Sequence, residues 1–387
     1  MGHGEPAARL PACLAESGRA WSSPAVLRAL RQVARDVTLD HEELPAAGVP
    51  AFTRAATELA LGGQSSALLE GRAGGVQTIG GMGAVWLGAR FLRRWYRTGQ
   101  PAPAWVYVAW PQREHYGHVF ADAGFADVQP YSWWDAAARA ASPRGLLRQL
   151  EDAPERSIVL LHAPEESGLA PEQWEEVAAA MERKRAFPFF DVSAQGLASG
   201  DLDRDAWALR HFVARGFELF CAQSFSKIFG LYDQRVGNLI VVTADAETLL
   251  SVRSQLQRQV ATAWASPSGL GARAVAAVLS NPALRSAWEQ SLRLLARRIV
   301  RLRQRLEQQL RVLGTPGSWE HITAQAGTRS FSGLLPAQVG FLAKHEHVYL
   351  GAGGQLSLCS LNARNLERVA RSIREAVLAP GRDAPSA

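Results

Sequence analysis

The chain has 387 residues, of which 47% are hydrophobic and 20% charged, and its formal net charge is +6 with a pI near 9.6. Its length allows two domains, and no apolar run is long enough to cross a bilayer, so the composition excludes a membrane-spanning protein. The N-terminal residues lack the apolar core of a signal peptide, and three scattered cysteines argue against a disulfide framework, so we expect a cytoplasmic protein.

From about Gly75 onward, short apolar runs alternate with amphipathic segments of helical length. Five of the runs are typical of buried strands: residues 104–110, 157–162, 186–191, 218–224 and 237–242. The segments between them predict helices at 82–95, 171–183 and 204–215. This alternation predicts an α/β fold whose central sheet is mainly parallel and flanked by helices on both faces.

A long helix is predicted over residues 287–313, because its leucines and one isoleucine recur at helical spacing. Its many arginines fall mainly on the other face and are better explained by solvent exposure than by a nucleic-acid site, since no recognised nucleic-acid motif accompanies them. Strand signals in 347–361 and a last helix at 366–378 predict a smaller α/β domain. We expect neither a nucleic-acid nor a membrane partner.

Only three of the 42 basic side chains are lysines, namely Lys184, Lys227 and Lys344. Lys227 lies in the stretch "AQSFSKIFGLYDQRVGNL", just after two serines and eight residues before Arg235. A solvated lysine in a polar turn is one interpretation. The other is an amine that forms an imine with a cofactor aldehyde, a task that arginine cannot perform.

Ligands of such sheets bind at the carboxyl ends of the strands. Asp191 ends one predicted strand, while Ser224 and Lys227 follow another. The stretch "GGMGA" at 80–84 opens a predicted helix, where free N–H groups and the helix dipole can hold a phosphate. Taken singly, each signal is weak, and Asp191 could equally be a strand-end cap. Their convergence at one edge predicts a binding site.

Residues 187–242 closely resemble the cytosolic aspartate aminotransferases of animals, and the likeness continues through "ARDVTLDHEELP", "AGGVQTIGGMGA" and "TPGSWEHITAQAG". The resemblance covers nearly the whole chain beyond about Trp21. It implies the type I fold of enzymes that use pyridoxal 5′-phosphate (PLP), and a homodimer. It also implies a shortened N-terminal arm at 1–20, a large PLP-binding domain at 21–293 and a small C-terminal domain at 294–387.

The resemblance also assigns roles to the candidate residues. Lys227 would bond the cofactor aldehyde and later move the substrate's α-proton, while Asp191 would pair with the pyridine N–H. The phosphate would be held by hydroxyls, backbone N–H groups and a charge-assisted pair with arginine, and His162 would lie near the ring. The expected cofactor-binding residues are Asp191, Ser224, Ser226, Lys227, Arg235, Gly81, Met82 and His162, and no metal is expected.

Several pocket positions depart from the family pattern. Gln355 and Ala261 stand where the family has the two arginines that hold the substrate's carboxylates, the second of them reaching across from the other subunit. Further departures are Ala194 for a tyrosine, Arg113 for a tryptophan, Met82 for a threonine, Glu43 for a tyrosine donated across the dimer, and "HAPEESG" at 162–168, which lacks an asparagine motif. Losing two bidentate arginines costs roughly 3–6 kcal/mol of productive binding.

We therefore expect an aminotransferase that moves an amino group between an amino acid and a 2-oxo acid, with weak or no activity toward aspartate. Two alternatives stay open at this stage. One is another PLP reaction such as racemisation of an amino acid. The other is a catalytically inactive protein that serves as a binding or dimerisation partner.

Overall fold

The structure is a computed structural model that describes residues 13, 15, 17–96, 104–111, 113–163 and 168–379, apart from the side chains of residues 113–115 and 352. The chain divides into two compact units. One spans Ser23–Ala296, and the other joins the residues up to Ser22 with Arg297–Ala387.

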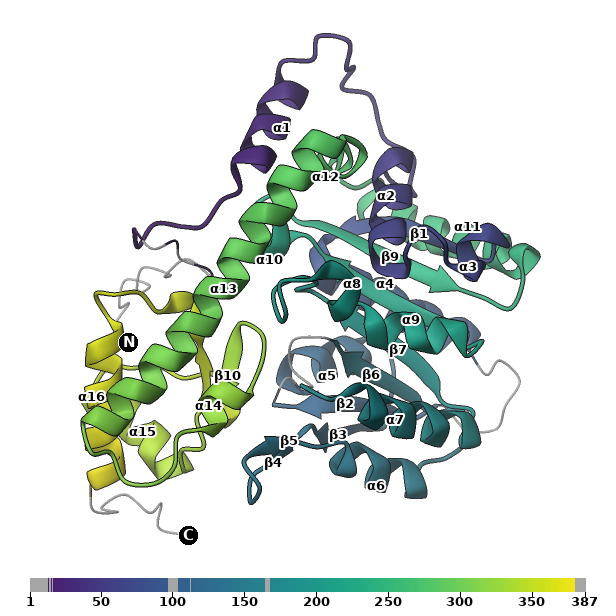
Figure 1. Cartoon of the computed structure of the whole chain (residues 1–387). Helices are drawn as coiled ribbons and strands as arrows, with labels where there is room; N and C mark the ends of the chain where they lie inside the picture. The colour runs from purple at the N-terminus through teal and green to yellow at the C-terminus, as the bar shows by residue number, and fades with distance from the viewer. Residues whose placement is uncertain are drawn as a thin grey trace, which may run out of the picture. The chain divides into compact units, whose positions relative to one another are not determined.

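The larger unit is built on a sheet of seven strands in the order β1-β9-β8-β7-β6-β2-β3 (Figure 1). The strands are β1 Ala73–Ile79, β2 Val106–Trp110, β3 Val128–Ser132, β6 Ile158–His162, β7 Phe187–Val192, β8 Leu219–Ser224 and β9 Val236–Val242. Strand β9 is antiparallel to both of its neighbours, and all other neighbouring pairs are parallel. The mainly parallel sheet is therefore confirmed, and the five expected strands lie within two residues of the observed ones.

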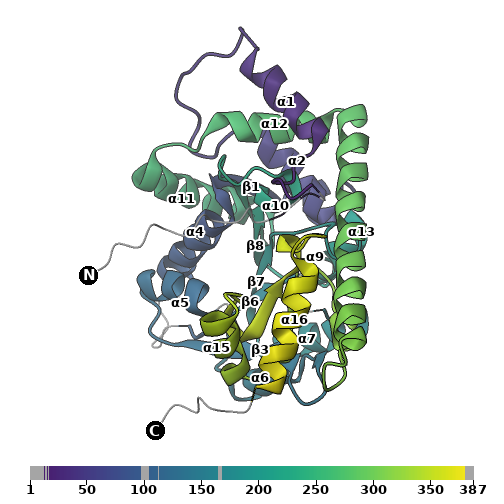
Figure 2. The ribbon, with the colours of Figure 1, turned by 90° about the vertical axis from the view of Figure 1, so that its left-hand side faces the viewer.

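Helices cover both faces of this sheet because the strands are apolar on both sides. One face packs against α2 Pro50–Leu61, α3 Ser66–Leu69, α6 Arg144–Asp152, α7 Pro171–Arg183 and α9 Trp207–Ala214. The other face packs against α4 Gly80–Trp95, α5 Arg113–Asp122 and α11 Ala246–Trp264. Figure 2 shows α4 and α5 on one side of the strands and α7 and α9 on the other.

The single helix expected at 204–215 is a wrong prediction, since the segment forms α8 Leu202–Asp205 and then α9. The two helices meet at Ala206, where Asp205 is only 4% exposed and turns its carboxylate toward the preceding loop. The unit is completed by α1 Pro24–Ala34, β4 Trp134–Asp135, β5 Ala140–Ala141, α10 Ser226–Phe229, α12 Gly269–Ser280 and the start of α13 Pro282–Val312.

The smaller unit contains the rest of α13, whose expected apolar positions are buried, among them Leu302, Leu306 and Leu310. Its other elements are α14 His321–Ala324, β10 Arg329–Phe331, α15 Pro336–His345, η1 Ala352–Gly354, β11 Gln355–Ser357, η2 Leu358–Ser360 and α16 Leu366–Leu378. Arg303 on α13 is 2% exposed and donates to the carbonyls of Ile322, Ala326, Gly327 and Arg329. This one guanidinium thus anchors the loop that leads into β10.

No helix among the described residues combines the length and the apolar character that a membrane span requires.

Candidate active site

The sheet register places three candidate positions side by side. His162 of β6 is paired with Asp191 of β7, and Asp191 is paired with Ala222 of β8. Ser224 lies two residues beyond Ala222, at the end of β8. Because β6, β7 and β8 are parallel, His162, Asp191 and Ser224 all lie toward the carboxyl edge of the sheet, as the sequence predicts.

Asp191 is 6% exposed, and its Oδ2 atom is faced by two rings. Tyr116 of α5 donates its hydroxyl to this oxygen, and His162 Nδ1 lies 3.8 Å from it. The Tyr116 and His162 rings are in contact, with centroids 4.9 Å apart. A buried carboxylate needs such donors, because burial without them is costly. Tyr116 was missed by the sequence analysis, since it lies 75 residues before Asp191 and nothing in its spacing indicates the contact.

Lys227 lies in the four-residue helix α10, three residues after β8 ends, and is half-buried between the buried Ser226 and Ile228. The turn that carries it is anchored from α13. There the Trp288 indole N–H donates to the Ile228 carbonyl at 2.8 Å, and the Trp288 ring stacks on Phe229 at 4.6 Å. These contacts fix the backbone on the C-terminal side of the lysine.

The start of α4 meets the end of β8 and the start of β9 at close range. A Cβ atom added at Gly80 would lie 2.9 Å from Nη2 of Arg235, and one added at Gly81 would lie 2.9 Å from Cβ of Ser224. Gly80 has φ +68°, a conformation that favours glycine, and at Gly81 the contact with Ser224 Cβ is shorter than real Cβ contacts, so glycine suits both positions. Ile79, the residue before α4, makes no side-chain cap, so the first N–H groups of this 16-residue helix have no side-chain acceptor there.

The donors around this point form what we call the cradle, namely the N–H groups at the start of α4, the Ser224 and Ser226 hydroxyls, and the Arg235 guanidinium. Hydroxyls, helix N–H groups and arginine together suit a phosphate. Met82, in the first turn of α4, is half-buried and its thioether adds no donor. Strand β8 and its neighbours β7 and β9 bring the cradle, the backbone of Lys227 and the buried Asp191 carboxylate to the same edge of the sheet.

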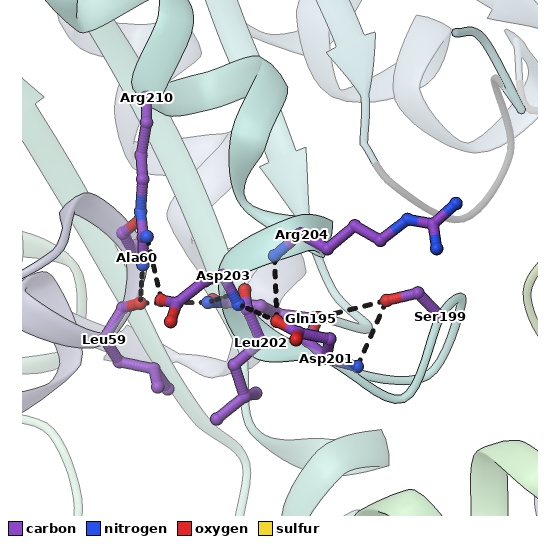
Figure 3. A network of polar contacts seen from close by, with 9 residues as sticks. All are labelled: Leu59, Ala60, Gln195, Ser199, Asp201, Leu202, Asp203, Arg204 and Arg210. Atoms are coloured by element: carbon purple, nitrogen blue, oxygen red, sulfur yellow. Dashed lines mark hydrogen bonds and ion pairs between the residues drawn. The ribbon is translucent and has the colours of Figure 1, made fainter. Parts of the chain in front are cut away.

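The loop after β7 is fixed by a polar network, shown in Figure 3. Gln195 donates through Nε2 to the carbonyls of Leu59 and Leu202. Arg210 of α9 donates to the carbonyls of Leu59 and Ala60 and forms an ion pair with Asp203 at 2.8 Å. These contacts tie the chain just beyond Asp191 to the C-terminal end of α2.

Asp205 closes the same loop from inside. Its carboxylate accepts from the N–H groups of Gly196, Ala198 and Ser199 and from the Ser199 hydroxyl. Burial raises the pKa of Asp205, while these four hydrogen bonds oppose the rise. The loop is therefore held around one buried acid.

The positions that depart from the family pattern are distributed over both units. Ala194 is fully buried after β7, whereas Ala261 on α11 and Glu43 are exposed. Gln355, on β11, is 6% exposed. The Arg113 side chain and residues 164–167 of the "HAPEESG" stretch lie outside the described residues.

Gln355 has a partner that the sequence analysis did not select. Arg329, on the neighbouring strand β10, is exposed and donates from Nη1 to the Gln355 side-chain oxygen at 3.4 Å. The antiparallel register of β10 and β11 produces this contact, since Phe331 is paired with Gln355 and Arg329 with Ser357. A guanidinium therefore lies against position 355, although position 355 itself is not an arginine.

A family model described as aminotransferase class I and II matches residues 12–373. The chain belongs to the class I and II aminotransferase family. The cytoplasmic aspartate aminotransferase of Gallus gallus is 47% identical over 366 residues, which cover 94% of this chain and 89% of that protein. A Bos taurus protein named "Putative aspartate aminotransferase, cytoplasmic 2" is 40% identical over 365 residues, which cover 94% of this chain and 88% of the bovine one.

Solved structures of aminotransferases have the same fold. The aromatic-amino-acid aminotransferase from Burkholderia pseudomallei, described as covalently bound to pyridoxal phosphate, superposes with a TM-score of 0.87 at 33% identity and covers 94% of this chain and 90% of its own. The family and the α/β fold that the resemblance implied are thus confirmed for this aminotransferase.

Proposed function

We propose that the chain is a PLP-dependent aminotransferase of the aspartate aminotransferase type, with a substrate pocket that no longer favours aspartate. The observation that carries the proposal is the convergence, at the carboxyl edge of one sheet, of a buried carboxylate, a phosphate cradle and a lysine. The protein acts in the cytoplasm, as the names of its relatives suggest, and as a homodimer.

The residues present fit PLP on structural grounds. The cradle offers donors and one guanidinium for a phosphate, and the glycines at its base leave room for the backbone to approach. Asp191 is buried and acidic, which suits a ring N–H. When bound, PLP supplies an aldehyde that bonds an amine and a ring that withdraws electrons from the substrate's α-carbon.

Each residue then has a task that its chemistry allows. With PLP present, Lys227 would hold the cofactor's aldehyde carbon through Nζ, and its free amine would be the base that moves the proton away from the substrate's α-carbon. Asp191 holds the proton at the ring nitrogen. Ser224, Ser226, Arg235 and the N–H of Gly81 bind the phosphate, and His162 orients the Asp191 carboxylate from its side.

By the resemblance to the family, the replacements at Gln355 and Ala261 would favour an amino acid with one carboxylate. Arg329 brings a guanidinium to Gln355, the position where the family holds the substrate's α-carboxylate. Ala261 supplies only a methyl group where the family holds a distal carboxylate. One charge-assisted hydrogen bond contributes about 1.5–3 kcal/mol, so aspartate loses roughly tenfold to a hundredfold at the distal group alone.

The test is the visible spectrum of the protein purified with PLP, compared with that of Lys227→Ala. A band in the wild type that is lost in the variant supports PLP chemistry at Lys227. A panel of amino acids, each mixed with the loaded protein, then shows which ones convert the cofactor to its amine form. Absence of the band from both proteins would leave the binding or dimerisation role, and exchange of the α-proton without amine formation would indicate racemisation.

A further inference from the structure

Tyr116 lies next to the candidate cofactor site, and the proposed function gives it no role. It lies on α5, outside the strands that carry the other candidate residues, and yet its hydroxyl donates directly to Oδ2 of Asp191. Its ring also contacts His162. The contact therefore links α5 to the buried carboxylate on β7.

The groups that interact with Asp191, by contact or through charge, come from three elements. From α5 comes the Tyr116 hydroxyl, and from β6 comes His162, whose Nδ1 lies 3.8 Å from the same oxygen. From β8 the influence is electrostatic only, because Cys221 pairs with Phe190 and lies on the opposite face of the sheet from Asp191. The pKa of this fully buried thiol is raised first by burial and then by the negative charge of Asp191. Tyr116 and His162 both lie against Oδ2 of the carboxylate.

A hydrogen bond from a neutral hydroxyl to a carboxylate has two consequences. It fixes the rotation of the carboxyl group, because an O–H···O⁻ bond is strong and directional. It also withdraws charge from the carboxylate, which then attracts a proton or an N–H donor less strongly. A phenol stays protonated through the neutral pH range, so this donor is constant under working conditions.

We propose that Tyr116 is a positioning residue of this site, whose hydroxyl orients Asp191 and sets how strongly that carboxylate stabilises the positive charge of the cofactor ring. The proposal rests on the proposed function, because it needs PLP to bind at this site. It adds a residue that tunes the cofactor through Asp191.

The experiment compares the wild type with Tyr116→Phe, which keeps the ring contact with His162 and removes only the hydroxyl. The readout is the pH midpoint at which the visible band of the lysine-bound cofactor changes. Without the hydroxyl, Asp191 stabilises the protonated cofactor more strongly, so the midpoint moves upward by about one pH unit, the size expected for one hydrogen bond.

Tyr131→Phe is the matched control, since the Tyr131 hydroxyl donates to the Leu160 carbonyl in the same unit. This control loses a buried hydrogen bond and keeps the wild-type midpoint. A second variant carries 3-fluorotyrosine at position 116, which keeps the shape of tyrosine and so preserves the fold. Its more acidic hydroxyl donates more strongly, and the midpoint moves downward.

The outcomes separate the two proposals. A wild-type band whose midpoint is unmoved in both Tyr116 variants overturns the role of Tyr116 and leaves the proposed function standing. The role of Tyr116 is also overturned if the midpoints of the two variants move in the same direction. The shift would then not follow the strength of the hydrogen bond from residue 116, as the proposal requires. Absence of the band from the wild type overturns the proposed function and this inference together.

Discussion

The approach of Gly81 to Ser224 gives the sharpest prediction about the cradle. In Gly81→Ala the new Cβ would lie 2.9 Å from Cβ of Ser224, whereas ordinary contact begins at 3.4 Å, so the start of α4 and the end of β8 must separate by about half an ångström. Overpacking of this kind costs about 1–3 kcal/mol. The same shift moves the Ser224 hydroxyl away from the helix N–H groups, and losing one hydrogen bond to a phosphate costs about 1.5–3 kcal/mol.

The expected result is a PLP dissociation constant that rises roughly tenfold to a hundredfold. The assay is a titration of the PLP-free protein with PLP, followed by quenching of its tryptophan fluorescence. Gly83→Ala is the matched control in the same helical turn, because its Cβ would meet Ile79 Cβ at 3.5 Å, an ordinary contact. Alanine is also the better helix former by about 1 kcal/mol, so this variant is as stable as the wild type or more so and binds PLP normally.

The reasoning is refuted if Gly81→Ala binds PLP as tightly as Gly83→Ala does. In that case either the packing at Ser224 is loose enough to absorb a methyl group, or the phosphate is not held where α4 and β8 meet.

Three further predictions concern the rest of the chain. Arg303→Met leaves four carbonyls, two of them in buried contacts, without their donor and should lower the free energy of unfolding in urea by about 3 kcal/mol or more. Arg301→Met, on the exposed side of α13, should change it little, and equal effects of the two variants would contradict the anchoring role. Arg329→Gln should lower the rate constant for amino-acid conversion at low substrate concentration by about tenfold or more, without changing the PLP dissociation constant. An unchanged rate constant would show that Arg329 does not bind the substrate carboxylate. The pKa of Glu182 is lowered, first by its hydrogen bond from Arg215, so this pair stabilises the fold above the ordinary glutamate pKa and the stabilisation is lost as the pH falls through the lowered pKa. Arg215→Gln should abolish this acid dependence of the thermal unfolding temperature. If the variant keeps the dependence, another group causes it.

The central strands were predictable because each is a continuous apolar run buried on both faces. Strands β1 and β3 were not predicted, and each has a physical reason. In β1, two glycines and the polar Gln77 hide the pattern, although Gln77 is buried and bonds the Val49 N–H and the Ser268 carbonyl. In β3, Pro130 interrupts the run, which an edge strand tolerates.

The residues of the candidate site were likewise predictable only in part from the sequence. Asp191 and Ser224 lie at the carboxyl ends of β7 and β8, Lys227 follows β8, and Arg235 directly precedes β9, so strand order alone brings their backbones together. Tyr116 and Arg329 could not be found in this way. The Tyr116 contact depends on where α5 packs, and the Arg329 contact depends on the register of the short strands β10 and β11. Neither is encoded in a local sequence pattern.

The bond between Lys227 and the cofactor aldehyde is the central claim, and it can be tested chemically. The protein loaded with PLP is reduced with borohydride, which fixes the cofactor on the amine that holds it, and the peptides are mapped by mass spectrometry. We predict a pyridoxyl-phosphate mass on the peptide that contains Lys227 and none on the peptides of Lys184 and Lys344. A label on either of those lysines, or no label at all, would contradict the account.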